Sequence, residues 1–293
     1  MLDSFTSPEY TPPPQIAMLC STFDYATLAE IYNQGRIDYI VPMPMNARRL
    51  EEYVRAYDVD MAASFVAMDG GDNMPNGLGM LSLRGSRSWI TRLGVNPERR
   101  RRKTGEFLVH YLLEQAAMRH APQIQLEVIQ DNTPAHNLFV KFGFKETRRL
   151  LIIRRPPGKL KTGLFIPPHT QVMSMDSPRI VQCLGQRPDA PSWVEETSSL
   201  LNAGGLHGLD VQLADGRSGW IIFQRTAFLM THFVLSAADD MELASILLTV
   251  VHRENPGHDT RVENVPADSP LLGAYFGTGY VEAFSRIEMK LHL

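Results

Sequence analysis

The segment with the clearest chemical content is a basic run between two apolar stretches. It reads Leu93-Gly94-Val95-Asn96-Pro97-Glu98-Arg99-Arg100-Arg101-Arg102-Lys103-Thr104-Gly105. The apolar pattern predicts a strand over residues 89–95 and an amphipathic helix over residues 104–120. A loop that enters a helix in this way directs unpaired N–H groups and the positive end of the helix dipole at one spot, which suits an anion. The basic side chains make that spot strongly basic, Gly105 permits a close approach of the backbone, and a pyrophosphate is a natural ligand.

A second segment combines an amide side chain with a helix and a glycine stop. It reads Asn132-x-x-Ala135-x-x-Leu138-Phe139-x-x-x-Gly143-Phe144. We expect a strand over residues 124–129 and then a short helix over residues 134–142, because Gly143 is a natural C-terminal stop. Asn132 stands where it can cap this helix, and this role is compatible with a contact to a cofactor.

Together the two segments resemble the signatures of the GNAT-superfamily N-acetyltransferases. The first family signature is a strand ending in Leu-x-Val, then Pro, then Arg/Gln-x-x-Gly-x-Gly/Ala. The second is Asn-x-x-Ala-x-x-Leu-Tyr-x-x-x-Gly-Phe. Both occur here in the expected elements and at about the usual separation, and the order of elements in residues 15–155 is similar to the whole family fold.

The resemblance implies that the chain binds acetyl-CoA, or another acyl-CoA, as a cosubstrate. In such proteins the pyrophosphate lies on the loop N–H groups, the pantetheine pairs with the end of the strand, and a backbone N–H polarises the thioester carbonyl. Carried over to this sequence, the implied cofactor-binding residues are Leu93, Gly94, Val95, Arg100, Arg101, Arg102, Lys103, Thr104, Gly105, Asn132 and Phe139.

Two positions depart from the family pattern. Lys103 replaces the first signature glycine, so one close approach to the phosphates is altered while a charge is added. Phe139 stands where many members have a tyrosine that protonates the leaving thiolate, and phenylalanine cannot donate a proton. The predicted strand supplies Trp89, Thr91 and Arg92 but no carboxylate, so we assign no catalytic acid or base.

The leading hypothesis is therefore an acyl-CoA-dependent N-acyltransferase. The acceptor would be an amine of a small molecule or peptide that attacks the thioester directly, so that the enzyme mainly supplies proximity and proton management. Phe139 and the missing base motivate an alternative, a non-catalytic protein that binds or senses acyl-CoA. A nucleic-acid-binding accessory protein is a weaker alternative, because one basic run without interleaved aromatic residues is thin evidence.

The elements that must position these residues follow a mixed α/β pattern. In the first half we expect a strand, two helices capped by Asp24 and Asn46, three strands, a long helix, a strand, a short helix and a strand. Their expected ranges are 16–20, 26–32, 47–56, 62–68, 78–83, 89–95, 104–120, 124–129, 134–142 and 147–153.

The end of this pattern recurs later in the chain. Residues 263–270 match residues 127–134 at an offset of 136 residues, and Tyr275 and Gly279-Tyr280 fall on Phe139 and Gly143-Phe144. An apolar strand over residues 228–235 and a helix over residues 241–251 complete the match. The predicted fold class is therefore α/β (α+β), with two GNAT-like domains, each a mixed, mostly antiparallel sheet flanked by helices.

The second copy lacks the basic loop. Its strand and helix are joined by Ser236-Ala237-Ala238-Asp239-Asp240, which is acidic and would repel a pyrophosphate. We interpret this copy as degenerate. The expected organisation is a flexible N-terminal segment (1–14), an acyl-CoA-binding domain (15–155), a Pro/Gly-rich linker (156–167) and the degenerate domain (168–293).

Composition narrows the class of protein further. The chain has 293 residues, a net charge of −3, 44% hydrophobic residues and 21% charged residues, as in ordinary globular proteins. No apolar run is long enough for a membrane span. Cys20 and Cys183 have no motif spacing, so a reducing cytoplasm is the default location. We expect His252 and His258 on a surface loop, no metal site and no nucleic-acid partner, while a homodimer fits the family.

Overall fold

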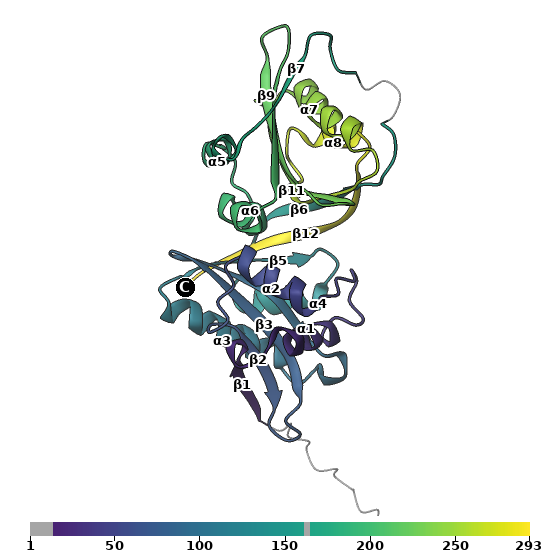
Figure 1. Cartoon of the computed structure of the whole chain (residues 1–293). Coiled ribbons are helices and arrows are strands. Elements are labelled where there is room, and N and C mark those ends of the chain that lie inside the picture. The colour runs from purple at the N-terminus through teal and green to yellow at the C-terminus, as the bar shows by residue number, and fades with distance from the viewer. Residues whose placement is uncertain (1–13, 161–164) are drawn as a thin grey trace, which may run out of the picture. The chain divides into compact units, whose positions relative to one another are not determined.

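The structure analysed is a computed structural model that describes residues 14–160 and 165–293. Contacts divide the chain into two compact units (Figure 1). The first contains residues 14–54, Val59–Ile124 and His292–Leu293, and the second contains Arg55–Asp58 and Gln125–Leu291. Residues 1–13 of the expected N-terminal segment and residues 161–164 of the expected linker lie outside the described residues.

The first unit is built on four strands in the order β1-β2-β3-β4, each antiparallel to the next. Helix α3 (Thr104–Met118) packs against β2, β3 and β4. The predicted caps are confirmed, because Asp24 accepts a 2.7 Å bond from Thr27 N and Asn46 a 2.9 Å bond from Arg49 N. The other elements are β1 (Gln15–Leu19), α1 (Tyr25–Gln34), α2 (Ala47–Ala56), β2 (Phe65–Asp69), β3 (Pro75–Arg84) and β4 (Arg87–Val95).

Strand β4 carries a bulge just before its last residues. Leu78 of β3 lies opposite Gly94, but Met80 lies opposite Thr91, so β4 has one residue more than β3 in this interval. Arg92 absorbs the extra residue with a positive φ of 52°. A bulge interrupts the hydrogen-bond ladder and re-aims the strand, which sets residues 93–95 apart from the regular pairing.

The second unit contains a sheet in the order β5-β12-β6-β11-β10-β9-β8-β7. Every pair with a defined register is antiparallel except β10 and β11, which are parallel. The predicted mixed, mostly antiparallel arrangement is thus confirmed. The strands are β5 (Gln123–Ile129), β6 (Lys145–Arg155), β7 (Gln171–Ser174), β8 (Leu206–Gln212), β9 (Ser218–Arg225), β10 (Leu229–Ser236), β11 (Asp259–Pro266) and β12 (Val281–His292).

The helices of this unit include the two expected from the repeat. Helix α4 (Thr133–Lys141) follows β5, and α8 (Leu272–Gly277) follows β11 in the same way. The glycines that end them, Gly143 and Gly279, both have a positive φ, of 89° and 100°, which glycine adopts without strain. The predicted duplication is therefore visible in the elements themselves. The remaining helices are α5 (Ser177–Gly185), α6 (Thr197–Ala203) and α7 (Met241–Glu254).

Strand β12 was not predicted, and it occupies an informative position. It pairs with β6 in antiparallel register from Val281 opposite Arg154 to Lys290 opposite Lys145. The last strand of the chain thereby lies between β5 and β6, which are consecutive in sequence. The predicted boundary at residues 156–167 separates these elements, whereas the compact units group them together.

The core of the second unit corrects one expectation. Helix α7 is buried over most of its length and includes His252, which is fully buried and lies 2.8 Å from the hydroxyl of Tyr280. The prediction of a surface loop for His252 is wrong, because the helix runs on to Glu254. Both cysteines are free and buried. Among the described residues, no helix is long and apolar enough to cross a membrane.

Candidate functional site

The basic loop joins β4 to α3 through a short 3-10 helix, Pro97–Arg99. Asn96 fixes its start by accepting a 3.2 Å bond from Glu98 N. Arg101 and Lys103 both adopt left-handed backbone conformations, with φ values of 64° and 59°. Lys103 occupies the position of the signature glycine, so the backbone keeps the conformation that glycine favours although the residue is a lysine.

The N-terminus of α3 has no capping partner in the part of the chain that the structure describes. Lys103, its N-cap residue, makes no side-chain capping bond. Among the described residues, nothing accepts a hydrogen bond from the backbone N–H groups of residues 101–105. The hydroxyl of Thr104 is also buried and has no partner. Unpaired N–H groups at a helix N-terminus, preceded by left-handed residues, form a concave anion-binding surface.

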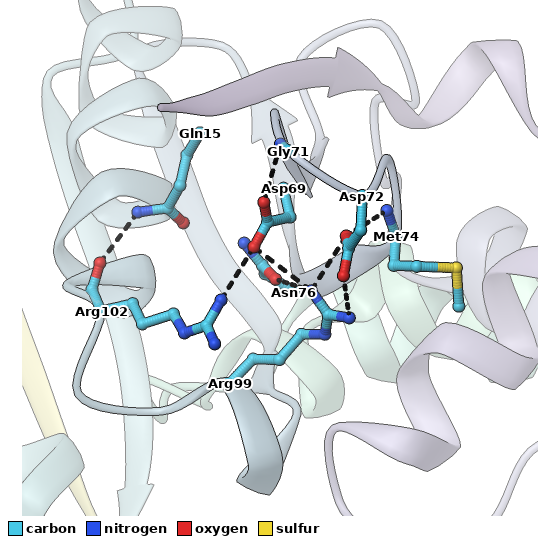
Figure 2. A network of polar contacts seen from close by, with 8 residues as sticks. All are labelled: Gln15, Asp69, Gly71, Asp72, Met74, Asn76, Arg99 and Arg102. Carbon is cyan, nitrogen blue, oxygen red and sulfur yellow. Dashed lines mark hydrogen bonds and ion pairs between the residues drawn. The ribbon is translucent and has the colours of Figure 1, made fainter. Parts of the chain in front are cut away.

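The basic side chains of the loop are less available than the sequence suggested. Figure 2 shows Arg99 and Arg102 converging on Asp69, which is 3% exposed. Arg102 lies 2.8 Å from its carboxylate, and Arg99 bonds Asp69 at 3.3 Å and Asp72 at 2.6 Å. The hydrogen bond from Arg99 lowers the pKa of Asp72. This network anchors the loop to the end of β2.

Arg100 has its own counter-ion. It donates two 2.7 Å bonds to the carboxylate of Asp38, and this lowers the pKa of Asp38. Of the basic side chains in the loop, only Arg101 and Lys103 have no ion pair with a described residue. The expected strongly basic spot is therefore corrected to a partly neutralised one, because three of its arginines are ion-paired.

The remaining predicted residues fall in two places. Leu93, Gly94 and Val95 form the end of β4, beyond the bulge and directly before the loop. Asn132 and Phe139 lie in the second compact unit, so they are considered by themselves. Asn132 caps α4 by accepting a 3.3 Å bond from Ala135 N. Phe139 is 5% exposed and packs against Phe144, with ring centroids 5.8 Å apart.

A cluster of arginines and tyrosines next to the end of β4 escaped the sequence analysis. The guanidinium of Arg92 lies 3.9 Å from the ring centroid of Tyr53 and donates a 3.0 Å bond to the hydroxyl of Tyr32. Arg36 lies 3.5 Å over the ring of Tyr39. A Cβ placed on Gly94 would lie 3.7 Å from Cγ of Arg36, so the Arg36 side chain runs along the end of β4.

Arg36 is the unusual member of this cluster. Its Nε is buried without a partner, and no described carboxylate lies within ion-pair distance. Burial lowers its pKa, and the charge of Arg92 adds to this effect, while Tyr32 and Tyr39 oppose it. A partly buried cation without a counter-ion favours an incoming anion. The sequence does not indicate this cluster, because Arg36 and Arg92 are far apart along the chain.

The equivalent loop in the second unit is closed to anions. Asp240, the N-cap of α7, accepts 3.0 Å bonds from the N–H groups of Glu242 and Leu243. Arg217 in turn bonds the carboxylates of Asp240 and Glu242 at 2.9 Å each. The carboxylate of Asp240 thus occupies the place that an external anion would take, in contrast to the uncapped N-terminus of α3.

Comparison with known proteins relates part of the chain to one family and the whole chain to one fold. The model of the acetyltransferase (GNAT) family matches residues 28–144. A putative acetyltransferase from Pyrococcus horikoshii is similar over 99% of this chain and 94% of its own, with 15% identity and a TM-score of 0.66. A GCN5-related N-acetyltransferase from Sphaerobacter thermophilus is similar over 96% and 97%, with 14% identity and a TM-score of 0.64.

A third similar structure has a tandem architecture. It is a tandem GNAT protein from the clavulanic acid biosynthesis pathway, with 14% identity, a TM-score of 0.65 and coverage of 95% of this chain and 98% of that one. A comparison with curated protein sequences gives no significant match. The GNAT acetyltransferase family model thus accounts for residues 28–144, and the chain as a whole has the fold of a tandem GNAT protein.

Proposed function

We propose that the protein is an acyl-CoA-dependent N-acyltransferase that transfers an acetyl group from acetyl-CoA to an amine. The observation that carries this proposal is the uncapped start of α3, where the N–H groups of residues 101–105 and the hydroxyl of Thr104 lack partners among the described residues. These groups would hold the pyrophosphate of CoA, with Arg101 and Lys103 adding charge. The GNAT family match over the same residues supports the assignment.

In this proposal the end of β4 holds the acyl arm. Residues 93–95 follow the bulge at Arg92, so their backbone groups are placed apart from the regular ladder and can pair with an extended ligand. A backbone N–H there would stabilise the charge that develops on the thioester oxygen. When bound, acetyl-CoA supplies the activated acyl group, and the chain holds the acceptor amine beside it.

The same hypothesis gives the second unit a different role. Because Asp240 caps α7, we propose that only the first basic loop holds a CoA pyrophosphate, with one cofactor per chain. We place the protein in a reducing cytoplasm, which suits two free buried thiols. A binding protein without activity stays the alternative, favoured by Phe139, whose side chain has no proton to donate.

The proposal is tested by titrating the full chain with acetyl-CoA in a calorimeter. We expect one site per chain and a loss of affinity of at least about tenfold when Arg101→Glu and Lys103→Glu are combined. Thr104→Val should also weaken binding without lowering stability, because its hydroxyl has no partner among the described residues. Arg48→Glu is the matched control, since Arg48 is an exposed arginine on α2. No heat at millimolar acetyl-CoA would refute the proposal, and binding without transfer to any amine would favour the alternative.

A further inference from the structure

The second unit contains a cavity of about 500 Å³ at the point where two parallel strands separate. Strands β10 and β11 pair only through Leu229–Asp259 and Met230–Thr260. Beyond these pairs, residues 233–236 of β10 and 262–266 of β11 line the cavity. Its volume lies in the range of small-molecule binding sites, which are commonly a few hundred Å³.

The charge of the cavity wall is predominantly negative. Among the described residues that line it, the basic side chains are Arg148 and Arg187, and both are already bonded within the chain. Arg148 lies 2.8 Å from Glu288 and also bonds Ala190 O, while Arg187 bonds Asp189 and the carbonyl of Glu195. The acidic residues in the wall are Asp189, Glu195, Asp239, Glu263 and Asp268.

Two buried acceptors in this wall have spare capacity. Glu195 is 7% exposed, and His232 Nδ1 lies 3.1 Å from its Oε1, while its Oε2 is buried without a partner. Tyr275 is 5% exposed and packs against Tyr280, with ring centroids 5.1 Å apart, and no hydrogen bond joins its hydroxyl to a described residue. A buried carboxylate oxygen is normally satisfied, so Oε2 of Glu195 indicates a missing hydrogen-bonding partner.

Glu263 adds a charged acceptor beside them. Arg286 bonds its Oε2 at 3.0 Å, but Oε1 has no partner among the described residues. The Glu263 side chain lines the cavity and is 31% accessible. Burial alone raises the pKa of this carboxyl, but Arg286 and Arg261 outweigh burial and lower it, so Glu263 is ionised at neutral pH.

These observations point to a cation rather than an anion. The cavity has acceptors to spare and no free guanidinium, and the nearby helix N-terminus is occupied by Asp240. We propose that the cavity binds a small molecule carrying a protonated amine, whose N–H groups donate to Glu263 and Tyr275. This site is distinct from the proposed acyl-CoA site and does not depend on transferase activity.

The site can be tested with two four-carbon ligands of opposite charge. Putrescine is titrated into the full chain by calorimetry, and succinate serves as the anionic counterpart. We expect one putrescine per chain with millimolar or tighter affinity and no binding of succinate. Trp220 lines the cavity, so its fluorescence should respond to putrescine, and Trp220→Phe should remove that response while the heat of binding remains.

Substitutions of two cavity residues test whether the ligand binds there. Glu263→Gln should weaken putrescine binding by at least about tenfold, and Tyr275→Phe, which is nearly isosteric, by about threefold or more. Glu254→Gln, an exposed carboxylate on α7, is the matched control and should change nothing. The proposal is overturned by absence of putrescine binding, by equal binding of succinate, by affinity that survives both cavity variants, or by displacement of putrescine with acetyl-CoA.

Discussion

The guanidinium of Arg100 donates two 2.7 Å hydrogen bonds to the carboxylate of Asp38, so the first arginine of the family signature already has a counter-ion in the chain. Both side chains are about half exposed, at 42% and 49%. An exposed pair of this kind stabilises a fold by about 1 kcal/mol at most, so it can be exchanged for another anion. A bound phosphate would have to compete with Asp38 for Arg100.

Asp38→Asn should therefore tighten CoA binding. Removing the competing charge leaves Arg100 available to the pyrophosphate, and we expect the Kd to fall by about threefold to tenfold at low salt. The gain should shrink as salt is added, because the interaction is exposed. Calorimetric titration at several salt concentrations measures it, with Glu52→Gln, which removes the exposed partner of Arg48, as the control. An unchanged Kd would show that Arg100 does not approach the phosphates.

Lys103→Gly should stabilise the folded chain. Lys103 has a φ of 59°, which costs a non-glycine residue about 1 kcal/mol or more, and glycine removes that cost against a smaller loss of entropy. We expect the free energy of unfolding to rise by about 0.5 kcal/mol, as measured by urea denaturation. Lys103→Ala keeps the strain and removes the charge, so it should not stabilise. Equal stability of the two variants would contradict this account.

Local signals in the sequence were sufficient for the elements that contain the loop. The strand that ends at residue 95, the helix that begins at Thr104 and the caps at Asp24 and Asn46 are all found as predicted. These features depend on neighbours within a few residues. The repeat was also readable, because β11 and α8 lie at the same offset from β5 and α4 as the matched residues.

Long-range partners could not be read from the sequence. Asp69 and Asp72 follow a different strand, so nothing near the basic run shows that they neutralise Arg99 and Arg102. The insertion of β12 between β5 and β6 likewise depends on pairing across more than a hundred residues. The unpartnered Nε of Arg36 is a property of packing, and no spacing rule indicates it.

Acid should destabilise the second unit through His252. This side chain is fully buried, and burial, followed by the charge of Arg155, lowers its pKa from 6.5 to about 3. Below about pH 6.5, His252 binds a proton in the unfolded chain but stays neutral in the folded chain. The free energy of unfolding therefore falls as the pH drops from about 6.5 toward 3. The slope is about 1.4 kcal/mol per pH unit for this group.

Urea unfolding between about pH 7 and about pH 5 measures the effect of His252. Glutamine does not titrate in this range. The free energy of unfolding of His252→Gln should therefore vary less with pH than that of the parent chain, by up to about 1.4 kcal/mol per pH unit. His258→Gln, which alters a partly buried histidine in the loop after α7, is the control. Parallel curves for the parent and His252→Gln would show that His252 does not set the acid sensitivity.

Phe139→Tyr should increase transfer if departure of the thiolate limits the rate. The family signature has tyrosine here, and a phenol can supply the proton that phenylalanine lacks. We expect kcat to rise by about tenfold or more, with little change in the KM for acetyl-CoA. Because Phe139 is 5% exposed and packs against Phe144, an unpaired hydroxyl would cost about 1 kcal/mol or more of stability. Phe144→Tyr is the control, and an unchanged kcat in Phe139→Tyr would exclude proton supply at this position as limiting.

Amines that carry a negative charge should be the preferred acceptors. Arg36 and Arg92 lie at the end of β4, where the acyl group is proposed to bind, and Arg36 has no carboxylate partner among the described residues. A carboxylate on the acceptor would complete this cluster, whereas a second ammonium would be repelled. Among γ-aminobutyrate, its amide and putrescine, we expect the highest kcat/KM for γ-aminobutyrate, by about tenfold over the amide.

Substitution of Arg36 assigns this preference to a side chain. Arg36→Gln should raise the KM for γ-aminobutyrate and leave the amide and acetyl-CoA unaffected, because only the charged group of the acceptor loses its partner. Arg36→Lys should restore part of the preference, since it keeps the charge but not the planar fork of donors. A rise in the KM for acetyl-CoA instead would place Arg36 on the cofactor, and equal rates for the three amines in the parent chain would contradict an anionic acceptor.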